Sequence, residues 1–260
     1  MSILKDQTAF IVGANGAIAM ASARLIARDG GTLFLMGRNE GRLSAFRDEI
    51  IAEFPDAQVA FHVGDTFAET DVRAAAQAAY DYKGRLDICV ATVADAVTAP
   101  VLNLDAAGFT KGMNDSIVPM FLALRYAAEL MRDGGAVVCV SSTAAKITMD
   151  MMAPYSAGKA GLEQLVRVAA AELGPRNIRV NAVRPGLTRA QTTGVLFDSE
   201  VVVKNFLAEV PLGRLGVPED IGQGIRFLVG PESSWITGQS IAIDGGNELR
   251  RGPDTSNVFG

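Results

Sequence analysis

A serine, a tyrosine and a lysine near the middle of the chain form the residue set best suited to chemistry. Ser142 ends an apolar, strand-like run, and Tyr155 and Lys159 follow it, four residues apart. In a helix this spacing places two side chains on one face, so the phenol and the ammonium can reach a common point. Open α/β sheets bind ligands at the carboxyl ends of their strands. The three residues therefore predict a proton-handling site at a strand end.

The rest of the chain must supply the elements that position these residues. Short apolar runs predict strands at Thr8–Val12, Thr32–Met36, Val59–Val63, Leu86–Ala91, Ala136–Ser141, Arg179–Val183 and Ser240–Ile243. Helical patterns alternate with them, at Ala17–Asp29, Glu40–Phe54, Glu69–Lys83, Phe109–Arg132, Tyr155–Leu173, Ser199–Glu209 and Pro218–Val229. Most of the strands are apolar throughout, as expected where helices cover both faces of a parallel sheet. The predicted fold is a single-domain, Rossmann-type α/β fold over residues 1–246, with a doubly wound parallel sheet of about seven strands and a C-terminal tail, 247–260.

The composition is that of a soluble globular protein and argues against several function classes. The chain has 260 residues, of which 49% are apolar and 20% charged, and its net charge of −5 argues against a nucleic-acid partner. No signal-peptide pattern and no membrane-length apolar run is found, so we expect a cytoplasmic protein. Cys89 and Cys139 are expected to be buried free thiols, and the lone His62 argues against a metal site and against Ser–His catalysis.

A glycine-containing turn after the first strand predicts a place for a nucleotide. Thr8–Val12 runs into Gly13-Ala14-Asn15-Gly16-Ala17-Ile18-Ala19 and then into a helix. Glycines let the backbone approach a pyrophosphate, which binds at the positive N-terminus of the helix. Taken alone the signal is weak, because the same pattern occurs in turns that bind no ligand.

Together the turn and the Tyr-Lys pair resemble the short-chain dehydrogenase/reductase family, and the likeness covers nearly the whole chain. The family's opening TGxxxGxG is met at Val12–Ala19, where the first glycine is kept and alanines replace the other two. Its YxxxK is met in full at Tyr155–Lys159, with Ser142 at the usual distance. Asn114 matches the family's asparagine in the middle of the long fourth helix. Further motifs are met at Asp65-Thr66, Ile178–Gly186, Pro211–Asp220, Ile236–Gln239 and Asp244–Gly246.

Two segments depart from the family pattern. The family's NNAG is replaced by Ala91-Thr92-Val93-Ala94, where we expect backbone contacts to remain and side-chain hydrogen bonds to be lost. The family's threonine near the nicotinamide carboxamide is replaced by Ala190, and Thr188, Thr192 or Thr193 can substitute for it.

The resemblance implies two sets of site residues. The catalytic set is Asn114, Ser142, Tyr155 and Lys159. The cofactor-binding set is Gly13, Asn15, Gly16, Ile18, Arg38, Asp65, Thr66, Ala91, Tyr155, Lys159, Pro185, Gly186 and Thr188. It also implies that Lys159 holds the nicotinamide ribose and that Asn114 holds a water in a proton relay.

The implied reaction is hydride transfer between a nicotinamide cofactor and a carbonyl or secondary alcohol. A free tyrosine has a pKa near 10, and a nearby cation lowers it, so we expect Lys159 and the oxidised nicotinamide to tune Tyr155 as the general acid and base. We expect Ser142 to hydrogen-bond the substrate oxygen.

The end of the second predicted strand indicates which cofactor is used. It reads Leu35-Met36-Gly37-Arg38-Asn39, with no carboxylate to accept from a ribose 2′-hydroxyl. Arg38 can bind a 2′-phosphate through two N–H groups, which favours NADP(H) over NAD(H). The alternative is that Arg38 is a solvated loop charge, either unpaired or paired with Glu40.

The substrate, the assembly and the function class have weaker signals. Methionines and apolar residues expected to border the cleft predict a small-molecule substrate that is largely apolar; they are Met149, Met151, Met152, Val195, Leu196, Phe197 and Phe206. The family suggests a homotetramer or homodimer, and the fifth helix has small residues that allow close approach: Ala157, Gly158, Ala160 and Gly161. The alternatives are a non-catalytic nucleotide-binding or scaffold protein of the same fold, and an enoyl reductase or dehydratase of the same family.

Overall fold

The computed structural model describes residues 3–93, 95–132, 134–190 and 193–249. Seven parallel strands form one sheet in the order β3-β2-β1-β4-β5-β6-β7. Their bounds are β1 Thr8–Val12, β2 Thr32–Gly37, β3 Val59–Val63, β4 Ile88–Ala91, β5 Gly135–Val140, β6 Ile178–Pro185 and β7 Ser240–Ile243. The strand order reverses between β1 and β4, which makes the carboxyl ends of these two strands the topological switch point of the sheet. The predicted doubly wound α/β fold is confirmed.

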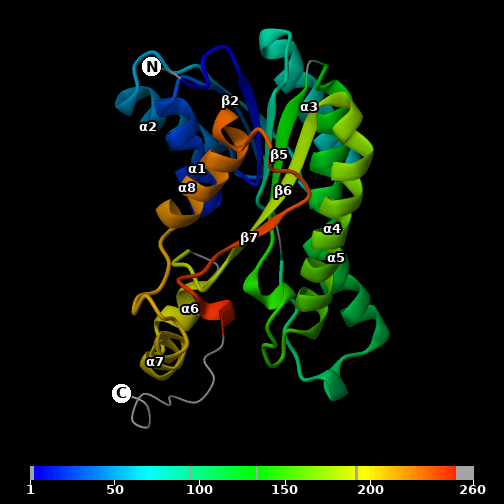
Figure 1. Cartoon of the computed structure of the whole chain (residues 1–260), viewed down its shortest axis with the longest axis vertical. Coiled ribbons are helices and arrows are strands. Elements are labelled where there is room, and N and C mark those ends of the chain that lie inside the picture. Colours follow the sequence, from blue (N-terminus) through cyan, green and yellow to red (C-terminus); the bar gives the residue numbers. More distant parts are fainter. Residues whose placement is uncertain (1–2, 94, 133, 191–192, 250–260) are drawn as a thin grey trace.

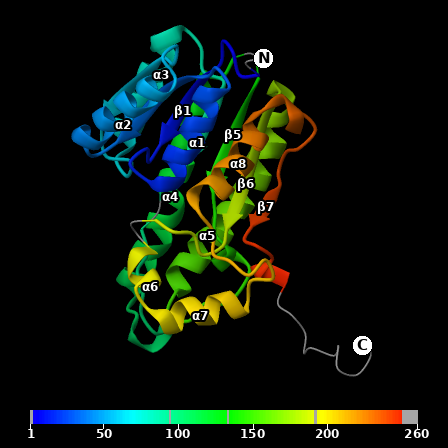
Figure 2. The same ribbon diagram turned by 90° about the vertical axis from the view of Figure 1, so that its left-hand side faces the viewer.

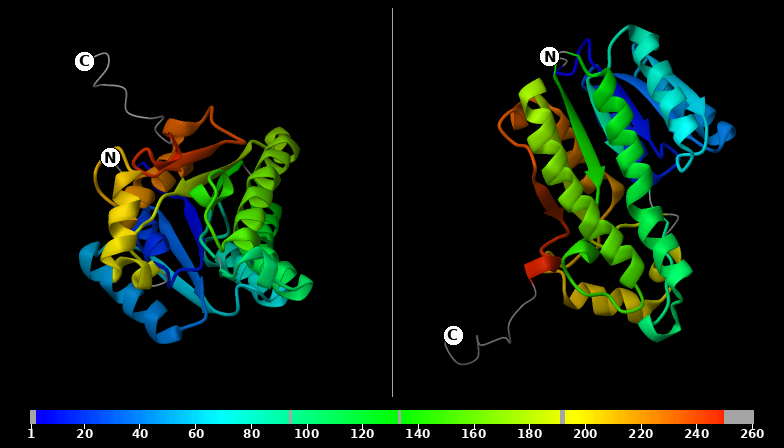
Figure 3. Two further views of the ribbon diagram at one scale, coloured as in Figure 1. Left: turned by 90° about the horizontal axis from the view of Figure 1, so that it is seen from below. Right: turned by 90° about the vertical axis from the view of Figure 1, so that its right-hand side faces the viewer.

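Helices cover both faces of the sheet (Figure 1). One face carries α1 (Ala17–Arg28), α2 (Glu40–Glu53) and α8 (Pro218–Val229), and Figure 2 shows α1 and α8 side by side. The other face carries α3 (Glu69–Lys83), α4 (Ala106–Leu130) and α5 (Ala153–Leu173), and α4 and α5 lie next to each other in the right-hand view of Figure 3. Two short helices, α6 (Gly194–Phe197) and α7 (Glu200–Ala208), lie beyond the carboxyl ends of the strands.

The core consists of the strands themselves, which explains their uninterrupted apolar sequences. All five residues of β1 and all four of β4 are buried. Polar side chains mark where helices begin: Asn39 caps α2 by accepting from the backbone N–H of Arg42 (2.9 Å), and Asp105 caps α4 by accepting from that of Gly108 (2.7 Å). The ordered core thus fixes the strand ends at which the predicted site residues lie.

The C-terminal boundary at residue 246 stays a prediction. Residues 247–249 form a 3₁₀ turn, η6 (Asn247–Leu249), in which Asn247 is buried. The remainder of the predicted tail, 250–260, lies outside the described residues. Among the described helices, none combines the length and the apolar character that crossing a membrane requires.

Candidate active site

Ser142 and Tyr155 meet at the carboxyl end of β5. The chain leaves β5 at Val140, and Ser142 follows in extended backbone (φ −162°, ψ 153°), with its Oγ accepting from the backbone N–H of Ala144 (3.2 Å). The chain then returns through a loop, and α5 begins at Ala153, with Pro154 in its first turn, where a missing N–H costs nothing. This path brings the Tyr155 phenol close enough to the Ser142 hydroxyl for that hydroxyl to lower the pKa of the phenol.

Lys159 lies buried beneath this pair. Its Nζ donates to the backbone carbonyl of Val140 (2.7 Å) and lies 5.6 Å from the centre of the Tyr155 ring. The side chain is only 1% exposed, and desolvation lowers the pKa of Lys159 from 10.5 to about 8. The ammonium therefore lies next to the phenol and is held by the last residue of β5.

The pKa of Tyr155 differs in direction from the sequence-based expectation. Burial raises the pKa of Tyr155 above its usual value of 10.0, and the nearby Ser142 hydroxyl offsets only part of the rise. The expected lowering by Lys159 is not found in the chain alone: desolvation of the phenolate has the largest influence, and it is the Ser142 hydroxyl that opposes it. Tyr155 is therefore a neutral phenol at neutral pH, which is the form that donates a proton.

Asn114 is not brought to this group. It is exposed on α4, about 200° around the helix from both Gly112 and Ser116, which are buried. These two residues face α5, because a Cβ on Gly112 would lie 2.8 Å from Pro154 Cβ and one on Gly158 would lie 2.7 Å from Ser116 Cβ. The position that faces the Tyr155–Lys159 turn is therefore Ser116.

Ser116 is the residue that the motif comparison missed. Its Oγ donates to the carbonyl of Gly112 (3.0 Å) and approaches that of Asp95 at 3.4 Å, so it ties α4 to the segment after β4. The sequence did contain a signal for it. Small and apolar residues recur at helical spacing on the buried face of α4, and they are Gly112, Ser116, Met120, Ala123 and Ala127.

The predicted nucleotide turn is held mainly by backbone groups. The N–H groups of Gly13 and Ala14 both donate to the carbonyl of Met36 (3.0 and 2.9 Å), and that of Gly16 donates to Gly13 (3.0 Å). Gly13 has a φ of +83°, and a Cβ there would lie 2.7 Å from Thr92 Oγ1. Only glycine therefore allows this approach of the turn to the segment after β4.

Thr92 corrects one expectation for the segment that replaces NNAG. Its Oγ1 donates to the carbonyls of Val12 (3.0 Å) and Gly13 (3.3 Å), and its backbone N–H donates to Val12 (3.0 Å). Side-chain hydrogen bonds are therefore present here, made by a threonine hydroxyl. Ala91, the preceding residue, is fully buried as the last residue of β4.

Asn15 and Arg38 lie at the tip of β2. The Asn15 side chain lies over Gly37, where a Cβ would come within 2.2 Å of its Oδ1, and its Nδ2 donates to the carbonyl of Asn39 (3.4 Å). Arg38 is exposed and makes no ion pair with any described residue, Glu40 included. Ile18 of α1 packs partly against the core.

Asp65 and Thr66 follow β3. One Asp65 carboxylate oxygen accepts from the N–H of Phe67 (3.1 Å), and the Asp65 N–H donates to Asp71 (2.9 Å). Thr66 is buried. The turn after β3 is therefore fixed by its own side chains.

Pro185, Gly186 and Thr188 form the turn after β6. A Cβ on Gly186 would lie 3.0 Å from Asp244 Cα, and Thr188 is buried with its Oγ1 donating to Gly186 (2.9 Å). The Thr193 hydroxyl also bonds within this loop, donating to the Thr188 carbonyl (2.7 Å). Thr192 lies outside the described residues.

The residues present fit a nicotinamide dinucleotide at this end of the sheet. Gly16 is exposed at the N-terminus of α1, and no side chain caps that terminus. The first backbone N–H groups of α1 are therefore available to a pyrophosphate. The turn that leads to them is held by the close approach of Gly13 to Thr92 and by the bond from Thr92 Oγ1 to the carbonyl of Val12.

Comparison with known proteins agrees with this geometry. Residues 13–248 match a family described as Enoyl-(Acyl carrier protein) reductase, a branch of the short-chain dehydrogenases/reductases. The chain belongs to the short-chain dehydrogenase/reductase family.

Relatives that match nearly the whole chain belong to the same family. The chain is 32% identical over 251 residues to L-rhamnose 1-dehydrogenase (NAD(P)(+)) of Azotobacter vinelandii, covering 94% of this chain and 97% of that protein. It is 28% identical over 245 residues to 3alpha-hydroxysteroid dehydrogenase of Mediterraneibacter gnavus, again covering 94% and 97%. It is therefore an oxidoreductase of the class that acts on CH–OH groups and the corresponding carbonyls.

Solved structures of the family superpose closely. A short-chain dehydrogenase/reductase from Mycobacterium ulcerans gives a TM-score of 0.90 at 29% identity, over 98% of this chain and 94% of that one. A 7 alpha-hydroxysteroid dehydrogenase complexed with NADH and 7-oxo glycochenodeoxycholic acid gives 0.89 at 28% identity, over 94% and 95%. Members of the family bind NAD or NADP, which agrees with the cradle described above.

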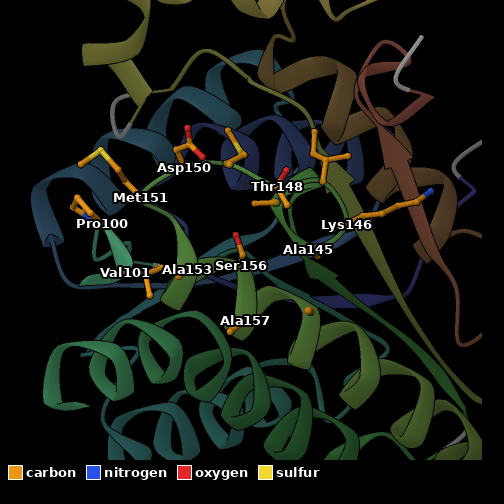
Figure 4. Close-up of a pocket in the computed structure, with 14 residues that line it drawn as sticks. Pro100, Val101, Ala145, Lys146, Thr148, Asp150, Met151, Ala153, Ser156 and Ala157 are labelled. Atoms are coloured by element: carbon orange, nitrogen blue, oxygen red, sulfur yellow. The ribbon is translucent and has the colours of Figure 1, made fainter. Parts of the chain in front are cut away.

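A cavity of about 660 Å³ lies between α5 and the loop that joins Ser142 to Tyr155 (Figure 4). Met149 and Met151 line it, as does the α5 face that carries Ser156 and Ala157. That face lies about 100–200° around α5 from Tyr155, and neither Ser142 nor Tyr155 is among the described residues that line the cavity. The predicted cleft residue Met152 is not among the described residues that line the cavity.

Proposed function

We propose that this family member transfers a hydride between NADP(H) and a carbonyl or secondary alcohol, with Tyr155 as the general acid and base. The observation that carries the proposal is that Ser142 and Tyr155 lie together at the carboxyl end of β5, next to the buried ammonium of Lys159. A scaffold protein would not need to bury an ammonium beside a phenol, since burial of the charge costs stability. The same arrangement gives a proton donor in a desolvated place.

The roles of the side chains follow from their environments. The bound nicotinamide supplies the hydride in reduction and accepts it in oxidation. Tyr155, a neutral phenol because burial raises its pKa, donates its proton to the carbonyl oxygen in reduction and accepts the alcohol proton in oxidation. Ser142 directs the same oxygen and stabilises negative charge that develops on it.

Lys159 supplies a positive charge near the phenolate that forms. With a pKa of about 8 it is mostly protonated at neutral pH, and its bond to Val140 fixes its position. Its buried ammonium favours the phenolate at the moment when the proton leaves Tyr155. We propose that Lys159 also holds the nicotinamide ribose. We further propose that Pro185, Gly186 and Thr188 form the turn that lies beside the nicotinamide.

The preference for NADP(H) rests on the tip of β2. Gly37 leaves no carboxylate for a ribose 2′-hydroxyl, and Asn15 occupies the space that a longer side chain at position 37 would need. Arg38 is exposed and free of ion pairs among the described residues, so its guanidinium is available to a 2′-phosphate. Relatives differ here, as one is named for NAD(P)(+) and another was solved with NADH.

The substrate we propose is largely apolar. Met149 and Met151 lie on the loop beside the catalytic group, and methionines adapt to irregular apolar ligands. Two relatives carry hydroxysteroid names, and a third is a sugar dehydrogenase, so a substrate panel must include both classes. Turnover of hydrophilic sugars alone would contradict the apolar substrate, and turnover of enoyl thioesters alone would contradict carbonyl chemistry.

We further propose a homotetramer or homodimer that pairs through α4 and α5, in the cytoplasm. Ala157 and Ala160 are exposed on α5 and small enough for a second helix to approach. Gly158, counted with them from the sequence, instead packs inside the subunit, where a Cβ would lie 2.6 Å from the carbonyl of Met113. Sedimentation at micromolar concentration as a 27.4 kDa monomer would contradict the oligomer.

The substitution Tyr155→Phe tests the proposed function. We expect kcat for carbonyl reduction with NADPH to fall about 100- to 10 000-fold, because general acid–base catalysis typically contributes that much. NADPH binding, followed by fluorescence, should stay within a few-fold of the wild type. A wild type that binds neither NADPH nor NADH would favour the scaffold alternative, and turnover that survives the substitution would remove Tyr155 from the mechanism.

A further inference from the structure

Four charged side chains form a connected group next to the catalytic residues. Arg184 Nη1 donates to Glu163 Oε2 (3.0 Å), and its Nε and Nη2 donate to the two carboxylate oxygens of Glu248 (2.6 and 3.0 Å). Lys146 Nζ lies 3.1 Å from Glu248 Oε2. The Glu248 and Arg184 side chains are only 6% and 14% exposed. Two carboxylates and two cations thus alternate along one chain of contacts, which lets the buried charges compensate each other.

Three members of this group, Glu163, Arg184 and Lys146, lie on segments that carry site residues. Glu163 lies on α5, one turn after Lys159, and its Oε1 accepts from the hydroxyl of Ser141, the neighbour of Ser142 (2.8 Å). Arg184 lies on β6, directly before Pro185. Lys146 lies on the loop between Ser142 and Tyr155, where Figure 4 shows it at the edge of the cavity.

Glu248 is placed by the turn that follows β7. The Asp244 carboxylate accepts from the N–H of Glu248 (2.7 Å) and from that of Gly246 (2.9 Å). The turn thus places a buried carboxylate against β6 and against the loop between Ser142 and Tyr155. Glu248 is nevertheless more than 80 residues from Tyr155 in the sequence. Its two partners, Arg184 and Lys146, have no other carboxylate in common among the described residues.

Two parallel ties hold the end of β5 against α5. One is the Lys159 bond to the carbonyl of Val140, and the other is the Ser141 bond to Glu163. The second tie depends on the orientation of Glu163, whose other oxygen is held by Arg184. Because Ser142 follows Ser141 directly, a change at Arg184 or Glu248 reaches the catalytic hydroxyl through a short series of hydrogen bonds.

We propose that Glu248 is a positioning residue for the reaction: through Arg184 and Glu163 it fixes Ser142 against Tyr155, and through Lys146 it fixes the loop between them. This inference rests on the proposed function, since it concerns the geometry of the same site. Glu248 itself touches neither Ser142 nor Tyr155. A displacement of about 1 Å at a reacting group can cost about 100-fold in rate, so a remote carboxylate can control turnover without touching substrate.

The substitution Glu248→Gln tests the proposal, because it keeps the shape and removes the charge. We expect kcat to fall about 10- to 100-fold while KM and Kd for NADPH stay within about three-fold, as misplacement of catalytic groups predicts. Amide hydrogen exchange in residues 141–151 should become faster. Glu248→Asp, which keeps a carboxylate one methylene shorter, should recover part of kcat.

The matched control is Asp29→Asn. Asp29 bonds Arg226 and joins the end of α1 to α8, and these side chains are 13% and 8% exposed, so this ion pair is buried to a similar degree. We expect Asp29→Asn to lower the melting temperature while kcat and exchange in residues 141–151 remain those of the wild type. The proposal is overturned if Glu248→Gln lowers kcat no more than Asp29→Asn does, or if KM rises and kcat does not change.

A second variant covers the case in which Glu248→Gln does not fold. Lys146→Met breaks only the exposed end of the group, since the Lys146 side chain is 58% exposed. It should speed exchange in residues 141–151 and lower kcat several-fold, and an unchanged kcat with unchanged exchange would overturn the proposal. The exchange measurement needs no substrate. A wild type without turnover would therefore count against the proposed function, whereas unchanged exchange in the variants would count against the positioning role.

Discussion

The proposed catalytic end of β5 and the proposed nucleotide turn after β1 are built from different kinds of contact. At the catalytic end, side chains make the decisive contacts: Ser142 lies beside Tyr155, and Lys159 donates to the carbonyl of Val140. At the nucleotide turn, backbone groups make most of them, as in the bonds from Gly13 and Ala14 to Met36. Proton transfer needs particular functional groups, whereas a pyrophosphate needs only backbone N–H groups at a helix N-terminus.

This difference explains where the sequence departs from its family. Tyr155–Lys159 is retained in full, while alanines replace two glycines at residues 17 and 19 and Thr92-Val93 stands in place of two residues of NNAG. Ala19 is fully buried, and Thr92 restores hydrogen bonds to the turn. A backbone cradle can keep its shape through such replacements, whereas proton transfer depends on the side chains themselves.

After Tyr155→Phe, the largest effect should come from the side-chain end, with Ser142→Ala. We expect kcat to fall about 100- to 1000-fold, as for loss of one donor to a developing oxyanion. Kd for NADPH should hardly change, because the turn after β1 is untouched. Ser142→Thr is the control: it keeps the hydroxyl, and the extended backbone at φ −162° suits a β-branched residue. If kcat falls equally in Ser142→Ala and Ser142→Thr, the hydroxyl does not act on the substrate oxygen as proposed.

The two regions also differ in how much the sequence could predict. The sheet and the Ser142, Tyr155 and Lys159 cluster depend on local patterns: apolar runs, helix ends and a spacing of four within one helix. Asn114 was chosen from one residue type, yet the rotation of α4 against α5 decides which residue faces the site, and Ser116 takes that place. The Thr92 bonds join residues 80 apart, and the direction of the Tyr155 pKa depends on burial, so neither could be predicted from local spacing.

Burial of Lys159 should make stability depend on pH. Folding lowers its pKa from 10.5 to about 8, so between these values the unfolded chain binds more protons. The free energy of unfolding should therefore rise with pH across this window as the buried charge is lost. Compared with Lys159→Met, the wild type should gain about 2 kcal/mol between about pH 8 and pH 10 in urea titrations.

A control separates this effect from general alkaline changes. Lys83→Met removes an exposed ammonium at the end of α3. The wild type and Lys83→Met should lose or gain stability in parallel over the same pH range. If the difference in the free energy of unfolding between wild type and Lys159→Met does not change with pH, the ammonium is not buried as described. That result would weaken the contrast between the two regions.

Arg38 is the exception in the backbone-built region, since its side chain is proposed to choose the cofactor. We expect Arg38→Ala to raise Kd for NADPH about 10- to 100-fold, the range for one lost charge-assisted interaction, and to leave Kd for NADH within about two-fold. Arg28→Ala removes a charge at the other end of α1 and should change neither constant. Equal losses for NADPH and NADH in Arg38→Ala would mean that Arg38 does not read the 2′-phosphate.

The smallest effect should come from Thr92→Val, which asks whether the backbone turn needs a side chain at all. Valine keeps the shape that packs on Gly13 but loses the bonds to Val12 and Gly13, so we expect about 1 kcal/mol less stability and a melting temperature lower by about 2–4 °C. Kd for NADPH should rise only a few-fold and kcat should stay unchanged.

Thr92→Ser keeps the hydroxyl and should bind NADPH as the wild type does. If both variants bind NADPH equally, the turn holds its shape through backbone bonds alone. If Thr92→Val abolishes binding, the nucleotide region depends on a side chain as strictly as the catalytic end does.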